Sequence, residues 1–243
     1  MAESMVCILL NNDDVSGLWL ARCLQQLSAQ TIKLISAEEL MYAPSFTCGI
    51  HNGQTFFKIN LQNGFEFTNK NTSTIINRIG YLPLQHLQQF KQEDSNYVQA
   101  ELMATFVFLF SSFRNPVFNT ASGRGLCGAE RSAAEWAMLA GKAGFCSDEM
   151  LYEEKEMYIQ QGAGSAKTFL VVVFNNRCYL QTDHLPVVIE KSCLKLLQLS
   201  GENILEVYCH MESGNVHFLS AALLPSFKDI NHNFIDELNK LLQ

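Results

Sequence analysis

The sequence predicts an α/β fold in which a parallel sheet comes first and antiparallel hairpins come last. Val6–Leu10 is a short continuous apolar run, which is typical of a strand buried on both faces. The capping residues 11–14 then precede a helical pattern, and Ile32–Ile35 is the next strand. Strand, helix and strand in this order indicate the start of a parallel sheet.

A hairpin follows this start. Thr55–Asn60 and Gly64–Thr68 are β-rich runs separated by three residues, and Gly64 tolerates the positive φ that such a turn needs. Thr74–Arg78 is a further strand. With these segments the predicted N-terminal α/β region reaches about residue 80.

Two helices with a short strand between them occupy the middle of the chain. The pattern over Tyr97–Phe113 predicts a helix that is apolar nearly all round toward its C-terminal half, and we expect much of it to be buried. Pro116–Asn119 is a short strand, and Ala129–Gly144 is a helix that stops at a C-terminal glycine. The charged segment Met150–Gly162 is a linker or a mobile helix.

The last third is the most regular part. Two hairpins and two helices are expected there: Thr168–Phe174 with Cys178–Thr182, Val187–Leu199, Ile204–Met211 with Asn215–Ala221, and Asn233–Leu242. Together with the earlier segments they suggest one large domain or two modest ones.

Composition excludes several classes of protein. Of 243 residues 48% are hydrophobic and 17% are charged, which is too apolar for a disordered chain. The net charge of -7 and the scattered basic residues argue against a nucleic-acid partner and against an anionic membrane surface. No apolar run is long enough for a transmembrane helix, and the N-terminus lacks a basic signal-peptide region, so we expect a cytoplasmic protein.

The eight cysteines contain no Cys-x-x-Cys pair, so most are interpreted as small buried hydrophobic residues. Residues 123–128 fit Gly-x-Gly-x-x-Gly, but they lack the βαβ context of a dinucleotide site and are interpreted as a loop before a helix. Arg124 in this loop is a candidate anion contact. Cys127, beside Arg124 and before the predicted helix, is the best candidate for a reactive thiol.

The histidines of the last third are candidate metal ligands. His184, His210 and His217 are close enough in the predicted topology to approach Cys209. Alternation along the strand, however, places Cys209 and His210 on opposite faces. Three or four convergent ligands are therefore not expected, and the sequence predicts no metal site.

Four short segments occur in the order 76–78 (Ile-Asn-Arg), 97–102 (Tyr-Val-Gln-Ala-Glu-Leu), 116–119 (Pro-Val-Phe-Asn) and 143–145 (Ala-Gly-Phe). In sequence and in order they resemble the ATP-grasp ligases that modify ribosomal peptides, the microviridin-type lactone and lactam ligases. The resemblance implies a pre-ATP-grasp-like α/β domain over 1–120. A helix and polar linker over 121–164 and an ATP-grasp C-terminal-like α+β portion over 165–243 would follow.

Two departures from the family pattern bear on activity. About twenty residues separate Phe145 from Lys167, where the family builds most of its nucleotide-binding subdomain. The family also holds magnesium with an acidic residue on one strand of the terminal hairpin and Glu-x-Asn on the other. Here Glu206 stands on the first strand, but Ser220 and Ala222 stand on the second. Glu206 alone is a poor magnesium site.

The resemblance and its departures imply a catalytically degenerate protein in natural-product peptide modification, with no cofactor and no metal. Its expected partners are a peptide substrate, a tailoring enzyme or a second copy in a homodimer. Two alternatives stay open: an enzyme with non-ATP chemistry at a Cys/His site, and a compact active ATP-dependent ligase. The candidate binding residues are Arg124, Cys127 and Glu206.

Overall fold

The fold was taken from a computed structural model that describes residues 5–85, 91–113, 115–146, 167–180, 185–227, 230 and 233–242. The chain divides into two compact units. The first unit holds residues 1–130 and 235–243, and the second unit holds residues 131–234.

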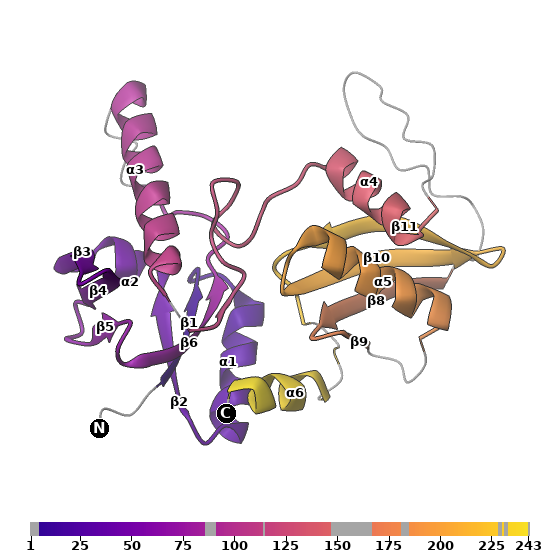
Figure 1. The fold of residues 1–243 in the computed structure, drawn as a ribbon, viewed down its shortest axis with the longest axis horizontal. Coiled ribbons are helices and arrows are strands. Elements are labelled where there is room, and N and C mark those ends of the chain that lie inside the picture. Colours follow the sequence, from indigo (N-terminus) through magenta and orange to yellow (C-terminus); the bar gives the residue numbers. More distant parts are fainter. Residues whose placement is uncertain are drawn as a thin grey trace. The chain divides into compact units, whose positions relative to one another are not determined.

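The first unit is built on a parallel sheet with the strand order β2-β1-β6-β7 (Figure 1). Its strands are β1 (Met5–Leu10), β2 (Thr31–Ser36), β6 (Thr72–Arg78) and β7 (Val117–Phe118). The predicted parallel start is confirmed, because β1 pairs in parallel with both β2 and β6. Val6, Cys7, Ile8 and Leu9 are all fully buried, as the continuous apolar run predicts.

Helix α1 (Val15–Leu27) connects β1 to β2 and begins where the capping residues predict. The Asp14 side chain is its N-cap and accepts a hydrogen bond from the Gly17 backbone N–H at 2.9 Å. A Cβ atom at Gly17 would clash with the Asp14 carboxylate, which explains a glycine inside the first turn despite its helix cost.

A small antiparallel sheet, β3-β4-β5, completes the first unit together with helix α2 (Ala37–Met41). The predicted hairpin is confirmed as β4 (Gln54–Asn60) and β5 (Glu66–Thr68). Strand β3 (Ser45–His51) was not predicted, although Asn52-Gly53 between β3 and β4 is a strong turn signal. Both turn residues have positive φ, at 50° and 70°.

Helix α3 (Gln92–Ser111) corrects the expectation that this helix is largely buried. Its buried side chains are Phe106, Leu109 and Phe110, which join the core of the first unit, whereas its N-terminal half is mostly exposed. Tyr97 is 67% exposed. Apolar content alone therefore overestimated burial, because only the C-terminal half of α3 packs against the core.

The second unit is an antiparallel sheet with the order β11-β10-β8-β9 and two helices on one face (Figure 1). The elements are β8 (Lys167–Phe174), β9 (Arg177–Tyr179), β10 (Ile204–Glu212), β11 (Asn215–Ala222), α4 (Ala133–Ala143) and α5 (Val187–Ser200). Both predicted hairpins are confirmed. Trp136 of α4 and Cys193 of α5 pack with Val171 and Val207 of the sheet in one core.

The closing helix α6 (Asn233–Leu242) is confirmed as well. Phe234 at its start is fully buried in the second unit, where its ring lies 5.1 Å from Phe227, 5.6 Å from Phe174 and 5.4 Å from Tyr179 between centroids. Across the residues that the structure describes, no helix is long and apolar enough to cross a membrane.

Candidate functional site

A polar cluster lies at the carboxyl ends of β1 and β6 in the first unit. The strand order reverses at β1, and in α/β sheets such a switch point is where ligands bind. Arg78 ends β6, is 3% exposed, and donates to the Asp14 carboxylate from Nε at 2.6 Å and from Nη2 at 2.9 Å. The charge of Asp14 is therefore already matched within the protein.

Other polar groups at this edge also bond to one another. The Asn11 side chain donates to the Tyr81 carbonyl at 2.9 Å and accepts from the Gly80 N–H at 2.8 Å. The Tyr81 hydroxyl donates to Asp13 at 2.8 Å, and this hydrogen bond is the main reason why the pKa of Tyr81 is raised. These hydrogen bonds hold the loops after β1 and β6 in place.

The glycine-containing loop after β7 is tied to the same sheet. Asn77 of β6 is fully buried and donates to the carbonyls of Asn119 at 2.7 Å and Leu126 at 2.6 Å. The Cys127 thiol is 5% exposed and donates to the Asn77 carbonyl at 3.2 Å. Cys127 is therefore part of the packing of this loop.

The predicted start of the following helix is wrong by several residues. Helix α4 begins at Ala133, and Ser132 is its N-cap in a capping box with Glu135. Because Ala129 is not helical, Cys127 does not lie at a helix N-terminus, where a thiol gains reactivity. Arg124 is exposed, and its backbone N–H donates to the Ser122 hydroxyl. An anion at Arg124 stays a prediction.

Buried thiols in both units favour the protonated form. Burial raises the pKa of Cys7 to about 11. Hydrogen bonds with Cys178 and Cys209, followed by burial, raise the pKa of Cys193 well above its usual value. Cys209 is fully buried on the core face of β10, opposite to the face of His210, as alternation predicts.

Glu206 lies on β10 at the end of the hairpin where a magnesium site is expected from the resemblance. Across the strand pair it faces Ala222, and the next residue on the same face, Tyr208, faces Ser220. Glu206 is 3% exposed, and its Oε2 accepts from the Ser226 N–H at 2.8 Å and the Ser226 hydroxyl at 2.7 Å. Burial, followed by the negative charge of Glu206, raises the pKa of Tyr208.

These residues do not fit a magnesium ion that bridges nucleotide phosphates. Such an ion takes several oxygen ligands in near-octahedral order. On the described strands β10 and β11, Glu206 and Ala222 lie opposite each other at this end of the hairpin. They supply one carboxylate and one methyl group. The carboxylate is already bound to Ser226.

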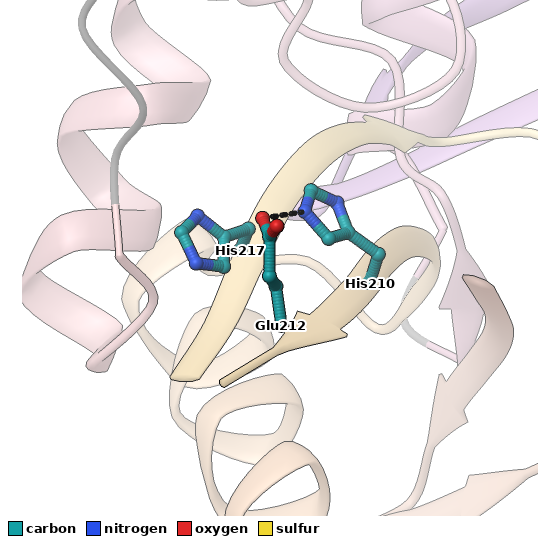
Figure 2. Close-up of side chains that lie close together, drawn as sticks. All are labelled: His210, Glu212 and His217. Carbon is teal, nitrogen blue, oxygen red and sulfur yellow. Dashed lines mark ion pairs between the residues drawn. The ribbon is translucent and has the colours of Figure 1, made fainter. Parts of the chain in front are cut away.

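A second polar cluster lies at the turn end of the same hairpin (Figure 2). The imidazoles of His210 and His217 stack with centroids 4.8 Å apart and an angle of 8° between the planes. Oε2 of Glu212 lies 3.9 Å from Nε2 of His210. One potential metal-ligand atom of each residue lies within 4.8 Å of the other two.

This arrangement partly corrects the sequence-based expectation. His210 and His217 do meet, and their third neighbour is Glu212 in place of Cys209. Because side chains alternate along a strand, residues 210 and 212 lie on one face. The sequence therefore indicates that Glu212 shares a face with His210. His184 lies outside the described residues.

No protein-family model matches the chain, and neither does any curated protein sequence. Among solved structures it is similar to macrocyclase MdnC bound with precursor peptide MdnA from Microcystis aeruginosa MRC. The identity is 10%, the TM-score is 0.71, and the match covers 98% of this chain and 99% of that one.

Two further ligases are similarly close. One is a Chryseobacterium gregarium RiPP-associated ATP-grasp ligase in complex with ADP and a leader and core peptide (11% identity, TM-score 0.69, 98% of this chain and 94% of that one). The other is ATP-grasp ligase PsnB complexed with a precursor peptide and AMPPNP (9% identity, TM-score 0.68, 100% and 98%). This chain therefore has the fold of the peptide-modifying ATP-grasp ligases.

Proposed function

We propose that this protein is a catalytically degenerate relative of the peptide-modifying ATP-grasp ligases, and that it acts in the cytoplasm as a binding or scaffolding partner. The observation that carries the proposal is the pairing of Glu206 with Ala222 on the terminal hairpin. A methyl group cannot replace a magnesium ligand, and without magnesium the charge of the nucleotide phosphates is not neutralised for phosphoryl transfer.

The contacts of Glu206 support a structural role for this carboxylate. It is buried, and it accepts two hydrogen bonds from Ser226 on the segment after β11. A buried carboxylate needs such donors to offset its lost hydration. Glu206 thus anchors the chain after the hairpin. The predicted loss of a nucleotide-binding subdomain falls on residues 147–166, outside the described residues, and the proposal does not depend on it.

The proposed partner is a peptide or an enzyme that modifies it. The solved structures of similar fold include a macrocyclase bound with its precursor peptide and a ligase in complex with a leader and core peptide. A chain that kept this fold and lost magnesium binding can still hold such a peptide, because peptide recognition and phosphoryl transfer use different groups. A homodimer is the second form of partner that we propose.

Calorimetric titration of the purified protein with ATP and magnesium tests the loss of nucleotide binding. We expect no heat of binding and no thermal stabilisation at millimolar ATP. A matched variant with Ser220→Glu and Ala222→Asn returns the missing ligand types to the hairpin and shows whether the rest of a nucleotide site is present. Binding by the unmodified protein tighter than about 100 μM, about 5.5 kcal/mol, would overturn the proposal.

A compact active ligase is the second candidate, and the near-complete coverage of MdnC favours it. It predicts ATP binding in the same titration and magnesium-dependent release of ADP or AMP. A Cys/His enzyme is disfavoured by the burial of Cys127 and Cys209. Fast labelling of either thiol by a thiol reagent at neutral pH would reopen that alternative.

A further inference from the structure

We propose that His210, Glu212 and His217 form a binding site for one divalent transition-metal ion, for which Zn²⁺ is the natural probe. The site lies at the turn end of the β10–β11 hairpin (Figure 2). It is separate from Glu206, which lies four residues earlier on β10, or about 13 Å along the strand at about 3.3 Å per residue. The inference does not rest on the proposed function.

The strand register brings the three side chains to one face. His210 and His217 are direct partners across the antiparallel pair, and directly opposite residues point to the same side. Glu212 is two residues after His210 on β10, so it shares that side. Figure 2 shows the Glu212 carboxylate directed toward both imidazoles.

A β-bulge contributes to this convergence. The register shifts by one residue between Tyr208 and Cys209, because Ser220 pairs with Tyr208 while Phe218 pairs with Cys209. Leu219 is the extra residue of the bulge. Without this shift His217 would lie on the core face, since a one-residue slip reverses the direction of every side chain.

The backbone around His217 is held on its outer side as well. Cys146 forms a parallel bridge to His217, with its N–H donating to the Val216 carbonyl at 2.7 Å and its carbonyl accepting from the Phe218 N–H at 3.4 Å. A ligand on a strand that is held from both sides loses little backbone entropy when it binds a metal. His217 is thus the best-positioned ligand of the three.

The distances require a small closure. Two ligand atoms of a tetrahedral zinc ion lie about 3.3 Å apart, given Zn–N distances of about 2.0 Å. The ligand atoms here lie within 4.8 Å of one another. Glu212 is 46% exposed and turns at little cost, whereas His210 is 14% exposed and more restricted. The closure would therefore come mainly from rotation of Glu212.

The ligand types select the class of metal. Two imidazoles and one carboxylate suit zinc and its neighbours among the divalent transition metals, whereas magnesium and calcium prefer oxygen ligands alone. Three protein ligands leave a fourth position on the ion. Water or an anionic group of a bound molecule would occupy it.

Titration of the chelator-treated full chain with Zn²⁺, against a competing chromophoric chelator, tests the site. We expect one equivalent to bind, and we expect His210→Gln and His217→Gln each to weaken binding by at least about tenfold. The control is His51→Gln, which changes an exposed histidine of β3 in the first unit and is expected to bind as the wild type does. Glu212→Gln should weaken binding too, with exposed Glu101→Gln as its control.

Cobalt substitution separates this site from the cysteines. A Co²⁺ ion held by imidazole and carboxylate has visible d–d bands without the intense near-ultraviolet band of a Co–thiolate bond. A thiolate band at one equivalent, or unchanged Zn²⁺ affinity in Glu212→Gln and in both histidine variants, would overturn the proposal. Circular dichroism of each variant in chelator confirms that it is folded, and the exposed Glu212 position keeps the test valid if a histidine variant misfolds.

Discussion

The ion pair of the first unit and the histidine cluster of the second unit place polar groups on a sheet in two different ways. Arg78 and Asp14 are 3% and 14% exposed and neutralise each other through two hydrogen bonds. His210, Glu212 and His217 bring three potential metal-ligand atoms within 4.8 Å of one another, and Glu212 is 46% exposed. The first arrangement pairs opposite charges within the protein, whereas the second gains stability from a bound cation.

The largest expected effect comes from breaking the buried pair. Arg78→Met should lower the free energy of unfolding by about 3 to 5 kcal/mol, because it leaves the Asp14 carboxylate nearly buried and unmatched. Urea denaturation of the purified variant measures this loss. Adding Asp14→Asn should recover part of it, since the amide can still cap α1 while the uncompensated charge is removed.

A loss below about 1 kcal/mol in Arg78→Met would contradict this prediction, because the edge of the parallel sheet would then not depend on its internal charge pairing. The same conclusion would follow if the double variant Arg78→Met with Asp14→Asn were less stable than Arg78→Met alone. Lys58, whose ion pair with Glu66 is half-exposed, is the matched control. Lys58→Met should cost less than about 1 kcal/mol.

Glu206 provides an intermediate case within the second unit. Glu206→Ala should cost about 2 to 4 kcal/mol, because two donors of Ser226 lose a charged acceptor in a buried setting. Glu206→Gln should cost less, since the amide oxygen still accepts. Thermal and urea unfolding measure both variants. Unchanged stability in Glu206→Ala would contradict a structural role and return this carboxylate to the candidate metal ligands.

Most of the fold was readable from the sequence because local signals and tertiary packing agree. The continuous apolar run of β1 and the Asp14 cap each predict what forms. Strand β3 was missed because its residues are mostly exposed and weakly patterned. Its Asn52-Gly53 turn carried the information instead.

The sites were harder to predict from the sequence than the fold. Glu206 was identified by its place on the hairpin, but its bond to Ser226 depends on how the chain folds back after β11. The meeting of His210 with His217 depends on the bulge at Leu219, which no local pattern reports. Cys127 was placed next to a helix N-terminus because the start of α4 was predicted four residues too early.

The loss of stability at alkaline pH tests whether burial keeps the Cys7 thiol protonated. The pKa of Cys7 is about 11 in the folded protein and 9.0 for a free thiol, so the stability that Cys7 contributes is complete below 9.0 and is lost as the pH rises to about 11. The loss amounts to about 2.7 kcal/mol at most. Unfolding free energies over this pH range should fall less steeply for Cys7→Ala than for the wild type or for Cys48→Ala, an exposed control. Parallel curves for all three would contradict the assignment.

The smallest effect is expected at the histidine cluster without metal. Because Glu212 is exposed and both histidines are only partly buried, His217→Gln should change the free energy of unfolding by less than about 1 kcal/mol in chelator. With Zn²⁺ at 100 times its dissociation constant, the wild type should gain about 2.7 kcal/mol and the variant much less. Thermal melts of both proteins with and without Zn²⁺ measure this difference. A large loss in chelator would place the cluster with the Arg78 pair as a structural element, and equal stabilisation of both proteins by Zn²⁺ would assign the metal to other ligands.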